Sequence, residues 1–472
     1  MRYPYFIEGS NESASVIASC DRTVNMMPEI VGPTGKNTTV LVGTPGLTLL
    51  RELQRDSIRG MFEGDLADED YFYCVADATL YKVGIDGDSA ETVGDVGEDA
   101  DSMPIRYVTG DTTADTLIVS NGTAYQLVSG VLSEISDLSG KTCLDCSYLG
   151  GYYIVITNEY LFYRSDLGDI STWDMTNYDY PDTQPEPLVG VINSQNQLWF
   201  FGKSRTSVWM LDSTNLMGMS RINNVSIRFG LWSNATLKIL DNGIIWLAAP
   251  QDGVGRVCLA RNFAPQKISI HSIDTILADN VSTLSTAYAL ITDDNGHEVY
   301  QLSIPGADTT LCYDASTQRW HERAYWTGSD YQLHLAKCST AKNGIQYVGA
   351  RNNAKVYTTS MTLYDDNGEA IRRMRRAPHI HVEDKYLTYD KMQLDVEKGL
   401  GDDGANPQMY MRYSDNGGKT YSTAIGSAMG ETDDDINTIR VEWNRLGTGR
   451  DYVFEVYSTA TQRHCWIDAY IN

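Results

Sequence analysis

A phrase of about forty residues recurs along most of this chain, and it constrains the fold more than any other feature. Each copy has a polar turn, a run of aromatic and aliphatic residues, a second polar turn and another aromatic run. The copies lie at 71–83, 116–128, 152–165, 198–211, 244–260, 288–302 and 345–359. Their equivalent positions are Tyr73, Leu117, Tyr153, Trp199, Trp246, Tyr288 and Tyr347, with successive steps of 44, 36, 46, 47, 42 and 59 residues.

A period near forty residues is that of a four-stranded propeller blade. One such sheet cannot bury both of its faces alone, so blades stack radially and close a ring. The sequence therefore predicts an all-β chain whose residues 1–366 form a six- or seven-bladed β-propeller. The N-terminal strand within 38–50 is expected to close the ring by pairing with the last blade.

The residues at the turns and a change in strand length complete the predicted fold. Asn-Gly dipeptides occur at 121–122, 242–243, 295–296 and 343–344. Both residues of such a pair adopt positive φ readily, which closes a two-residue hairpin. Beyond residue 366 the strands become longer and alternate in polarity, so residues 367–472 are predicted to form a separate C-terminal antiparallel β-sandwich.

The charge balance limits the possible partners. The chain has 37 Lys and Arg against 62 Asp and Glu, which gives a net charge of -25. This charge argues against a protein that neutralises nucleic-acid phosphates along its whole surface. The eight cysteines are scattered through the sequence, and we expect them to be reduced and mostly buried.

Candidate chemistry is sparse. No P-loop, dinucleotide fingerprint, GxSxG or HExxH motif occurs, so the sequence predicts no catalytic residue and no cofactor. His379 and His381 would share one face of a strand, but a metal site there needs a third ligand that the sequence does not identify. We therefore predict no metal site.

The stretch YSDNGGKTYS at 413–422 is similar to the Asp-box turn of sialidase-type propellers. Its residues Ser414, Asp415 and Gly417 match the pattern approximately. A sialidase also needs an arginine cluster for the sugar carboxylate and a Tyr nucleophile with an acid partner, and a single box outside the propeller supplies neither. The stretch favours a structural turn, and a sialidase-like or carbohydrate-binding propeller remains the alternative function.

A basic run, IRRMRRAPHIH at 371–381, stands out on this acidic chain. Three interpretations of its arginines stay open: docking onto an acidic patch of a neighbouring subunit or domain through bidentate pairs, a solvated linker between domains, and contact with DNA phosphates. Docking is favoured. The interface candidates are Arg372, Arg373, Arg375 and Arg376.

Two sets of residues, near the two ends of the chain, carry a resemblance to a known family. The first is N-x-x-P-E followed by P-G-L, and the second is S-D-x-G followed by W-x-R-L-G-x-x-R-D. In this order and spacing the chain resembles the packaged-DNA stabilisation proteins of short-tailed bacteriophages, also called tail accessory or tail hub proteins. The motif residues are Asn25, Pro28, Pro45, Gly46, Ser414, Asp415, Gly417, Trp443, Arg445, Gly447, Arg450 and Asp451.

The resemblance implies a non-enzymatic structural protein of the virion tail, assembled in the cytoplasm of the host bacterium. It implies a homo-hexameric ring below the portal or its adaptor ring, in contact with the tail needle or plug and with tailspikes or fibres. Double-stranded DNA would pass through without sequence-specific binding, and no membrane would be involved. For the second motif set we expect Trp443 to pack, Gly447 to turn, and Arg445 or Arg450 to pair with Asp451 or another carboxylate.

Overall fold

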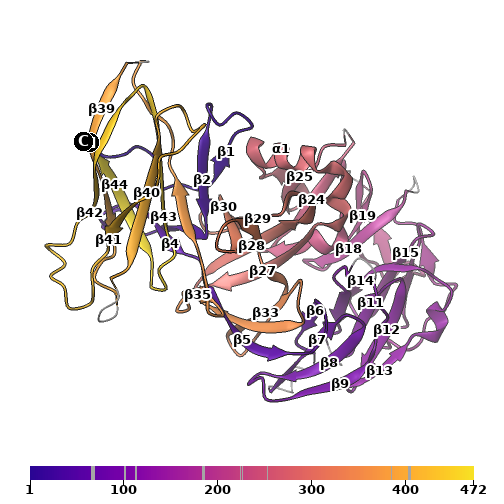
Figure 1. Cartoon of the computed structure of the whole chain (residues 1–472). Helices are drawn as coiled ribbons and strands as arrows, with labels where there is room; N and C mark the ends of the chain where they lie inside the picture. The colour runs from indigo at the N-terminus through magenta and orange to yellow at the C-terminus, as the bar shows by residue number, and fades with distance from the viewer. Residues whose placement is uncertain are drawn as a thin grey trace.

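Seven antiparallel propeller blades follow one another around a ring in the part of the chain that the structure describes (Figure 1), and four of them are separate four-stranded sheets. The structure is a computed structural model. It describes residues 1–64, 70–99, 102–111, 114–182, 186–223, 225, 227–251, 253–383, 385–401 and 406–472. The chain is thus an all-β propeller of seven blades, followed by the β-rich region predicted from the sequence.

The strands of blades one to four run in chain order from the axis outward. Blade one contains β6 (Ile58–Phe62), β7 (Tyr71–Ala76), β8 (Thr79–Gly84) and β9 (Ala90–Asp95), and blade two contains β10 (Arg106–Thr109), β11 (Thr116–Ser120), β12 (Thr123–Val128) and β13 (Val131–Glu134). Blade three contains β14 (Cys143–Leu149), β15 (Tyr152–Thr157), β16 (Phe162–Arg164) and β17 (Tyr178–Asp179), and blade four contains β18 (Leu188–Ser194), β19 (Gln197–Gly202), β20 (Thr206–Leu211) and β21 (Met219–Arg221).

Blades five to seven depart from this plan in detail. Blade five contains β22 (Phe229–Leu231), β23 (Lys238–Leu240), β24 (Gly243–Pro250), β25 (Arg256–Arg261) and β26 (Ala264–Lys267). Blade six contains β27 (Tyr288–Asp294), β28 (His297–Ile304), β29 (Thr309–Asp314) and β30 (Arg319–Trp326), and blade seven contains β32 (Ala336–Lys342), β33 (Ile345–Ala350), β34 (Lys355–Ser360) and β5 (Gly46–Glu52). In blade five, β22 and β23 both pair with β24, so together they make one interrupted inner strand. Short strands β31 (Tyr331–Leu333), β35 (Asp365–Asp366) and β36 (Glu369–Ala370) extend the edges of blades six and seven.

Neighbouring blades share buried hydrophobic clusters, because each sheet buries both faces only against the next one. Representative pairs across the six successive boundaries are Phe62 with Ile118, Leu117 with Tyr153, Phe162 with Phe200, Phe201 with Trp246, Leu259 with Tyr300, and Leu290 with Tyr357. The ring closes where Phe72 of blade one packs on Tyr347 of blade seven, with ring centroids 4.8 Å apart.

One repeat position is out of register with the others. Six of the seven lie on the second strand of a blade, but Tyr288 lies on β27, the first strand of blade six. The cause is an insertion before that strand, α1 (His271–Asp279) and the 3-10 helix η3 (Val281–Thr286), which displaces the blade along the sequence. Ile273 and Leu277 of α1 pack into the cluster between blades five and six.

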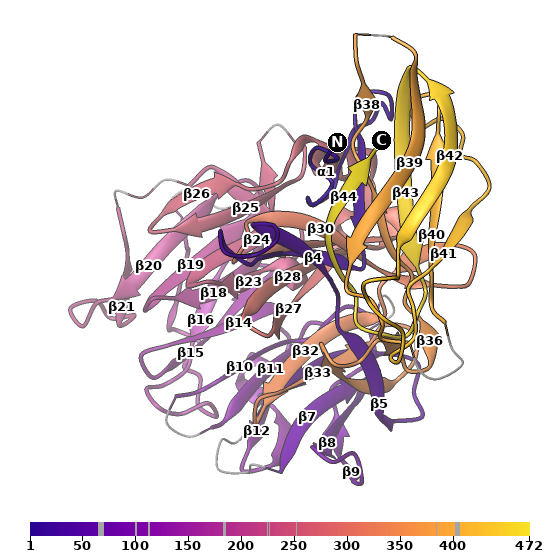
Figure 2. The same ribbon diagram turned by 90° about the vertical axis from the view of Figure 1, so that its left-hand side faces the viewer.

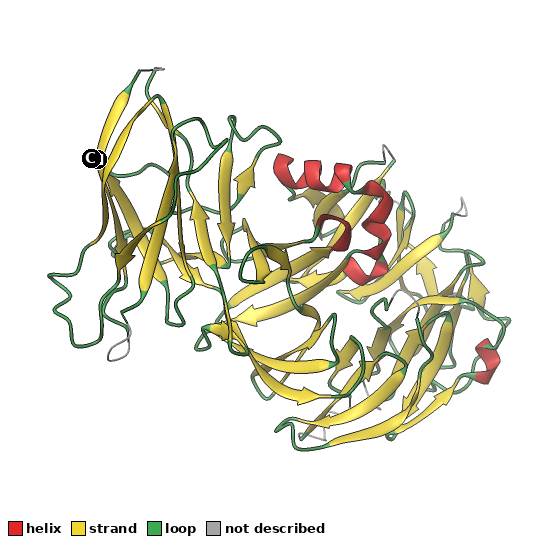
Figure 3. Cartoon of the chain, viewed as in Figure 1, coloured by secondary structure: helices red, strands yellow, loops and turns green. Residues whose placement is uncertain are grey.

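The remaining helical segments are single 3-10 turns: η1 (Ser136–Leu138), η2 (Asn234–Thr236) and η4 (Pro305–Ala307). Figure 3 shows how little helix the chain has beside its strands. None of the described helices is long and apolar enough to cross a membrane. All eight cysteines are free, and six of them are buried, as expected for reduced core thiols.

Three of the four predicted hairpin turns have the expected form. Asn and Gly at 121–122, 295–296 and 343–344 both have positive φ and join consecutive strands of one blade. In the fourth case the turn is Asp241–Asn242, both with positive φ, and Gly243 is already the first residue of β24. The turn is displaced by one residue because Asp and Asn also tolerate positive φ.

The N-terminal segment is divided between the two parts of the chain. Strand β5 pairs with β34 and so supplies the outer strand of blade seven. Strand β4 (Thr39–Gly43) instead pairs with β3 (Met26–Ile30) and with β44 (Cys465–Ile471), near the other end of the sequence. The domain boundary at residue 366 stays a prediction, but residues 39–43 lie in a sheet with C-terminal strands.

The C-terminal region contains two sheets that face each other. The first has the order β3-β4-β44-β39-β42, and the second has β2-β37-β43-β40-β41. The new strands are β1 (Asn11–Glu12), β2 (Cys20–Val24), β37 (Arg373–Arg376), β38 (Ile380–His381), β39 (Leu387–Val396), β40 (Gln408–Ser414), β41 (Ile425–Ala428), β42 (Val441–Gly449) and β43 (Asp451–Ser458).

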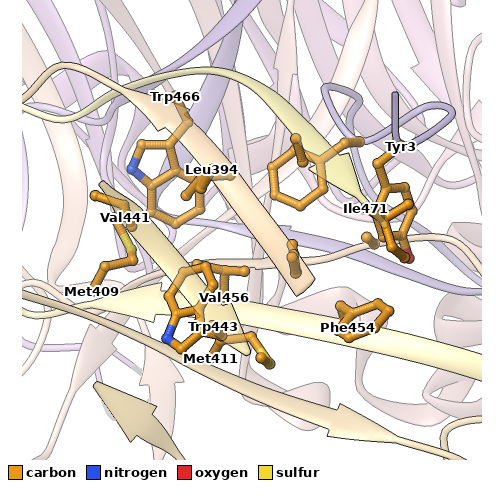
Figure 4. Packing of buried hydrophobic residues seen from close by; sticks show 14 of the residues in the cluster. Tyr3, Leu394, Met409, Met411, Val441, Trp443, Phe454, Val456, Trp466 and Ile471 are labelled. Atoms are coloured by element: carbon orange, nitrogen blue, oxygen red, sulfur yellow. The ribbon is translucent and has the colours of Figure 1, made fainter. Parts of the chain in front are cut away.

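The core of this sandwich lies between the two sheets (Figure 4). Trp443 and Trp466 come from the first sheet, and Met411 and Phe454 come from the second. Tyr3 of the N-terminal segment packs on the ring of Phe454 at 6.0 Å. The two ends of the chain meet on this unit, since the Ile471 amide donates to the Met1 carbonyl at 2.8 Å (Figure 2).

Candidate functional site

The four arginines of the basic run lie where the propeller meets the sandwich. Strand β37 pairs with β2 on one side and with β43 on the other. Strand β2 also pairs, in parallel, with β30 of blade six. The sheet of blade six therefore continues into the sandwich, and β37 is an internal strand of that continuous sheet.

Arg375 is completely buried and fixes the N-terminal segment. Its Nε donates to the Phe6 carbonyl at 2.6 Å, and its Nη2 donates to the Tyr5 carbonyl at 2.9 Å. Its Nη1 donates to Thr23 Oγ1 at 2.9 Å and also forms an ion pair with Asp21. A guanidinium with its donors paired in this way is well suited to a buried site.

Arg376 takes part in a small charge network around Glu455. The Glu455 carboxylate is 1% exposed and accepts from Arg376 Nε at 3.0 Å and from Arg412 Nε at 2.7 Å. Arg376 also donates to Glu12 at 2.9 Å. Because two guanidinium groups share one buried carboxylate, the network depends strongly on Glu455.

Arg372 is held by aromatic rings. Its guanidinium carbon lies 4.0 Å from the ring centroid of Tyr457, 4.4 Å from that of Trp326 and 5.4 Å from that of Tyr331. Trp326 lies on β30, Tyr331 on β31 and Tyr457 on β43, so the cation–π contacts join the propeller to the sandwich.

Arg373 differs from Arg375 and Arg376, whose Nε atoms both donate hydrogen bonds. Its side chain is 1% exposed, yet its Nε has no hydrogen-bond partner among the described residues. Its Nη atoms reach only the Tyr364 carbonyl, at 3.3 and 3.4 Å. Burial lowers the pKa of Arg373 to about 10.

The positions of the four arginines exclude part of the interpretation made from the sequence. Arg373 and Arg375 are buried within the chain, so their guanidinium groups are not on a surface that a flat patch of a neighbouring subunit could cover. Arg372 and Arg376 are partly exposed, and their contact with another subunit stays a prediction. Residues 373–376 of the run form strand β37 of the junction rather than a solvated linker.

Two cavities have charged linings. The larger, of about 830 Å³, lies between the sandwich and the end of blade seven and is lined by residues that include Arg373 and His464. The other, of about 510 Å³, is lined by Arg205, Arg221 and Arg228 at blades four and five. No group of three metal-ligating side chains occurs within the described ranges.

Comparison with models of known protein families identifies the family of this chain. The family model described as "Bacteriophage P22 Gp10, beta-propeller" matches residues 6–362. This match covers all seven blades. The chain belongs to this phage stabilisation family. The resemblance inferred from the two motif sets is thereby confirmed at the level of the family.

Solved structures add similarity at low identity. They include the extracellular domain of a hybrid two-component system from B. thetaiotaomicron, with a TM-score of 0.44, 10% identity, and coverage of 82% of this chain and 47% of that chain. The chain thus spans about half the length of that structure. The computationally designed Ika8 protein has a TM-score of 0.36 and 12% identity, with coverage of 66% of this chain and 99% of that chain. The structure of YCF48 bound to D1 peptide has a TM-score of 0.40 and 12% identity, with coverage of 66% of this chain and 95% of that chain. Comparison with curated proteins found no match.

The N-terminal motif of this phage stabilisation protein organises the junction. Asn25, between β2 and β3, has φ of 56°. Its side-chain amide donates to the carbonyls of Ala324 and Arg372 at 2.9 and 3.0 Å, and its Oδ1 accepts from the Ala324 amide at 2.8 Å. Pro28 lies in β3 opposite Leu41. Pro45 offers its carbonyl to Arg323 Nη2 at 2.6 Å.

Gly46 permits a close approach of two backbone segments. A Cβ atom at this position would lie 2.3 Å from the Asp365 carbonyl oxygen and 2.8 Å from that of Leu363. Because those atoms belong to backbone, they cannot move aside cheaply. We expect Gly46→Ala to lower the free energy of unfolding by about 1–3 kcal/mol in urea denaturation.

Gly426→Ala is the control for that substitution. Its new Cβ would meet the Gln408 side-chain oxygen at 3.3 Å, and that flexible side chain is able to move. We expect a change within about 0.5 kcal/mol. Equal losses for the two variants would contradict the close approach at Gly46.

In the C-terminal motif, the turn at 413–422 is held by Ser414 and Asn416 rather than by Asp415. Ser414 Oγ accepts from the Gly418 amide at 2.8 Å, and Asn416 Oδ1 accepts from the Thr420 amide at 3.0 Å. Asp415 is exposed. Gly417 has φ of 70° and approaches Asp451, where a Cβ would lie 2.8 Å from the carboxylate.

Trp443 is 1% exposed and donates from Nε1 to the Ile425 carbonyl at 2.8 Å. Gly447 has φ of 91° in the bulged end of β42. Arg445 is exposed with φ of 63°. The guanidinium of Arg450 lies 4.5 Å from the ring centroid of Tyr386.

The Asp451 carboxylate pairs with His379, which was not among the partners proposed for it from the sequence. His379 Nδ1 lies 2.8 Å from Asp451 Oδ1, and Nε2 lies 2.7 Å from the Val16 carbonyl oxygen. Both acceptors require an N–H, so the ring is protonated. Hydrogen bonds with Cys20 and with Asp451 raise the pKa of His379 to about 9.

Stability should therefore fall at alkaline pH. The folded-state pKa of His379 lies above its unfolded value of about 6.5, so its contribution is complete below that pH and is lost as the pH rises to about 9. We expect the free energy of unfolding to fall by about 1–2 kcal/mol over this range, and His379→Gln to lack that part of the fall. His381→Gln, at an exposed position, should keep the wild-type pH profile. Identical profiles for all three proteins would rule out His379 as the cause.

Glu455 and Asn416 are the important residues that the sequence interpretation missed. Glu455 has a detectable signal, since it is a lone carboxylate inside the otherwise apolar strand run YVFEVY. Such a residue is seldom buried without a charged partner. Asn416 has no comparable signal, because Asp and Asn side chains satisfy the same turn geometry.

Proposed function

We propose that this phage stabilisation protein is a structural subunit of the tail of a short-tailed phage. Six copies would form a ring below the portal or its adaptor ring, retain the packaged DNA, and form part of the conduit through which the DNA leaves. The observation that carries the proposal is the family match over residues 6–362.

The charge of the chain supports the conduit part of the proposal. With a net charge of -25, a ring of six copies repels a DNA duplex and does not hold it by its phosphates. Double-stranded DNA would pass without sequence-specific contact. Retention would then come from blocking the exit, together with the needle or plug.

The junction between propeller and sandwich supports the proposal that the chain is a structural subunit of a ring. The ion pair between Arg22 of β2 and Glu322 of β30 and the aromatic contacts of Arg372 fix the sandwich against blade six. A subunit with a rigid angle between its two parts presents the same lateral surfaces in every copy, as a closed ring requires. Tailspikes or fibres would attach to the outside of such a ring. Assembly would take place in the host bacterial cytoplasm, where the free cysteines stay reduced.

Ring formation on a portal complex is the decisive test. We expect the purified protein to form a sixfold ring in negative-stain images after incubation with the purified portal and adaptor of the same phage, and no ring with an unrelated portal. A template is included because weak lateral contacts close a ring only when copies are held together. A chain that remains unbound to its own portal would overturn the proposal.

A sialidase-like or carbohydrate-binding propeller is the second candidate, because Arg205, Arg221 and Arg228 line one cavity. Arginine clusters of this kind suit a sugar carboxylate. The described lining includes no tyrosine to act as a nucleophile, and Arg221 already pairs with Asp182 at 2.8 Å. We expect no release of fluorophore from a fluorogenic sialoside and no heat on titration with sialic acid; either signal, lost in Arg221→Met, would favour this alternative.

A further inference from the structure

One cavity lies beside the junction and has Arg373 in its wall. This cleft, of about 830 Å³, is bounded by the hairpin at Asn295, by residues 361–364 after blade seven, and by strands β4, β39 and β44 of the sandwich. Clefts between two structural units are frequent binding sites. Arg373 and His464 line it and are 1% and 2% exposed.

Arg373 has donor capacity that the chain itself does not use. Its Nε is without a partner, and its Nη atoms share the Tyr364 carbonyl at long distances. It makes no direct ion pair with a carboxylate among the described residues. Asp366 is the acidic group with the strongest charge interaction with it, and that carboxylate also faces Arg323.

Arg375 provides the comparison within the same strand. Two residues away and equally buried, it donates to three backbone carbonyls and one hydroxyl and pairs with Asp21. A buried arginine that serves only the fold is expected to look like Arg375, because unsatisfied buried donors are costly. Arg373 does not have this arrangement.

The backbone leaves room for the Arg373 side chain. A Cβ at Gly43 would lie 2.5 Å from Arg373 Nε, so a larger residue there would displace the guanidinium from its present position. Gly43 is itself part of the cleft wall. The position of the unpaired Nε is therefore built into the strand beside it.

The lining indicates the kind of ligand. Met361, Val396, Ile436 and Ile467 supply apolar surface, which suits the side chains of a polypeptide better than a small ion. The lining also holds three carboxylates, which three cations other than Arg373 balance: Glu29, Asp395 and Glu397 against Lys36, Lys398 and Arg463. One guanidinium in excess suits a single carboxylate better than a polyanion such as DNA. A single carboxylate on an apolar segment satisfies both conditions, because a guanidinium binds carboxylate through paired N–H groups.

We propose that this cleft binds an apolar polypeptide segment of a partner protein through one carboxylate, which pairs with the guanidinium of Arg373. The inference rests on the proposed function, in which the chain has protein partners. It adds the chemistry of one contact, an acidic side chain or chain terminus of the partner inserted between propeller and sandwich.

Calorimetric titration with short peptides tests the inference. The probes are acetyl-Val-Glu-Val-amide and its glutamine counterpart, with acetate, inorganic phosphate and a DNA duplex as separate titrants. We expect the glutamate peptide to bind at millimolar concentration or better, and the glutamine peptide to bind on the order of 10-fold more weakly. Equal binding of the two peptides, no binding of the glutamate peptide, or tighter binding of phosphate or DNA would overturn the inference.

Substitutions separate the roles of binding and folding. Arg373→Met should abolish the preference for glutamate while keeping a melting temperature at or above that of the wild type, since it removes an incompletely paired buried charge. Arg440→Met, at an exposed position outside this cleft, should leave peptide binding unchanged. A folded Arg373→Met variant that still prefers the glutamate peptide would overturn the inference.

Arg373→Lys keeps the test valid if the methionine variant does not fold. Lysine retains the charge but lacks the planar fork, so the glutamate peptide should bind several-fold more weakly than to the wild type. Unchanged binding would overturn the inference. Ring formation on the portal is measured without peptide, so the two experiments are independent. If the protein binds the peptide but forms no ring, only the proposed function is contradicted. If it forms a ring but does not bind the peptide, only this inference is contradicted.

Discussion

Arg375→Met is expected to lower the free energy of unfolding by about 3–5 kcal/mol. The substitution keeps an unbranched side chain but removes the donors to the carbonyls of Tyr5 and Phe6 and the positive charge beside Asp21. These groups are then left without partners inside the junction, and Asp21 becomes an uncompensated buried charge. Urea denaturation followed by tryptophan fluorescence measures the loss, because Trp443 and Trp466 lie in the sandwich core.

Arg440→Met is the matched control, since Arg440 lies on the surface of the same unit and donates only to nearby backbone carbonyls. Its effect should stay within about 0.5 kcal/mol. If both variants lose the same small amount of stability, the N-terminal segment does not depend on Arg375 and the junction described for β37 is incorrect.

Asp145→Ala is expected to destabilise the propeller by a similar amount, about 3–5 kcal/mol. Asp145 is fully buried on the inner strand of blade three. It accepts from Arg106 Nε of blade two at 2.7 Å and from the Val191 amide of blade four at 3.0 Å. One carboxylate thus joins three consecutive blades, and its removal leaves the Arg106 charge and a buried amide unpaired.

Glu159→Ala tests whether that loss is due to burial. Glu159 pairs with Lys141 at 2.8 Å on the exposed surface of blade three, where an ion pair contributes at most about 1 kcal/mol. Thermal unfolding of the two variants should therefore differ clearly. A loss for Asp145→Ala no larger than that for Glu159→Ala would mean that the inter-blade contacts do not stabilise the ring.

The candidate site was only partly accessible from the sequence. Four arginines in five positions drew attention to this segment as a docking candidate, because such a charge density is unusual on an acidic chain, but they did not predict a strand that joins the two units. Their partners were not accessible, since Asp21, Glu12 and Glu455 lie far from them in the sequence. The sequence also contains no sign that Arg373 and Arg375, two residues apart, differ in how their donors are used.

The sequence alone determined the repeating sheets, because strand polarity, aromatic spacing and hairpin turns such as Asn121–Gly122 are set by residues within one blade. Only the tertiary structure decided the rest: the position of Tyr288 after the α1 insertion, the division of the N-terminal segment, and the partners of β37. The last two depend on pairing between segments hundreds of residues apart, such as β4 with β44. Local pattern does not specify such pairing, because any exposed strand edge offers the same backbone donors and acceptors.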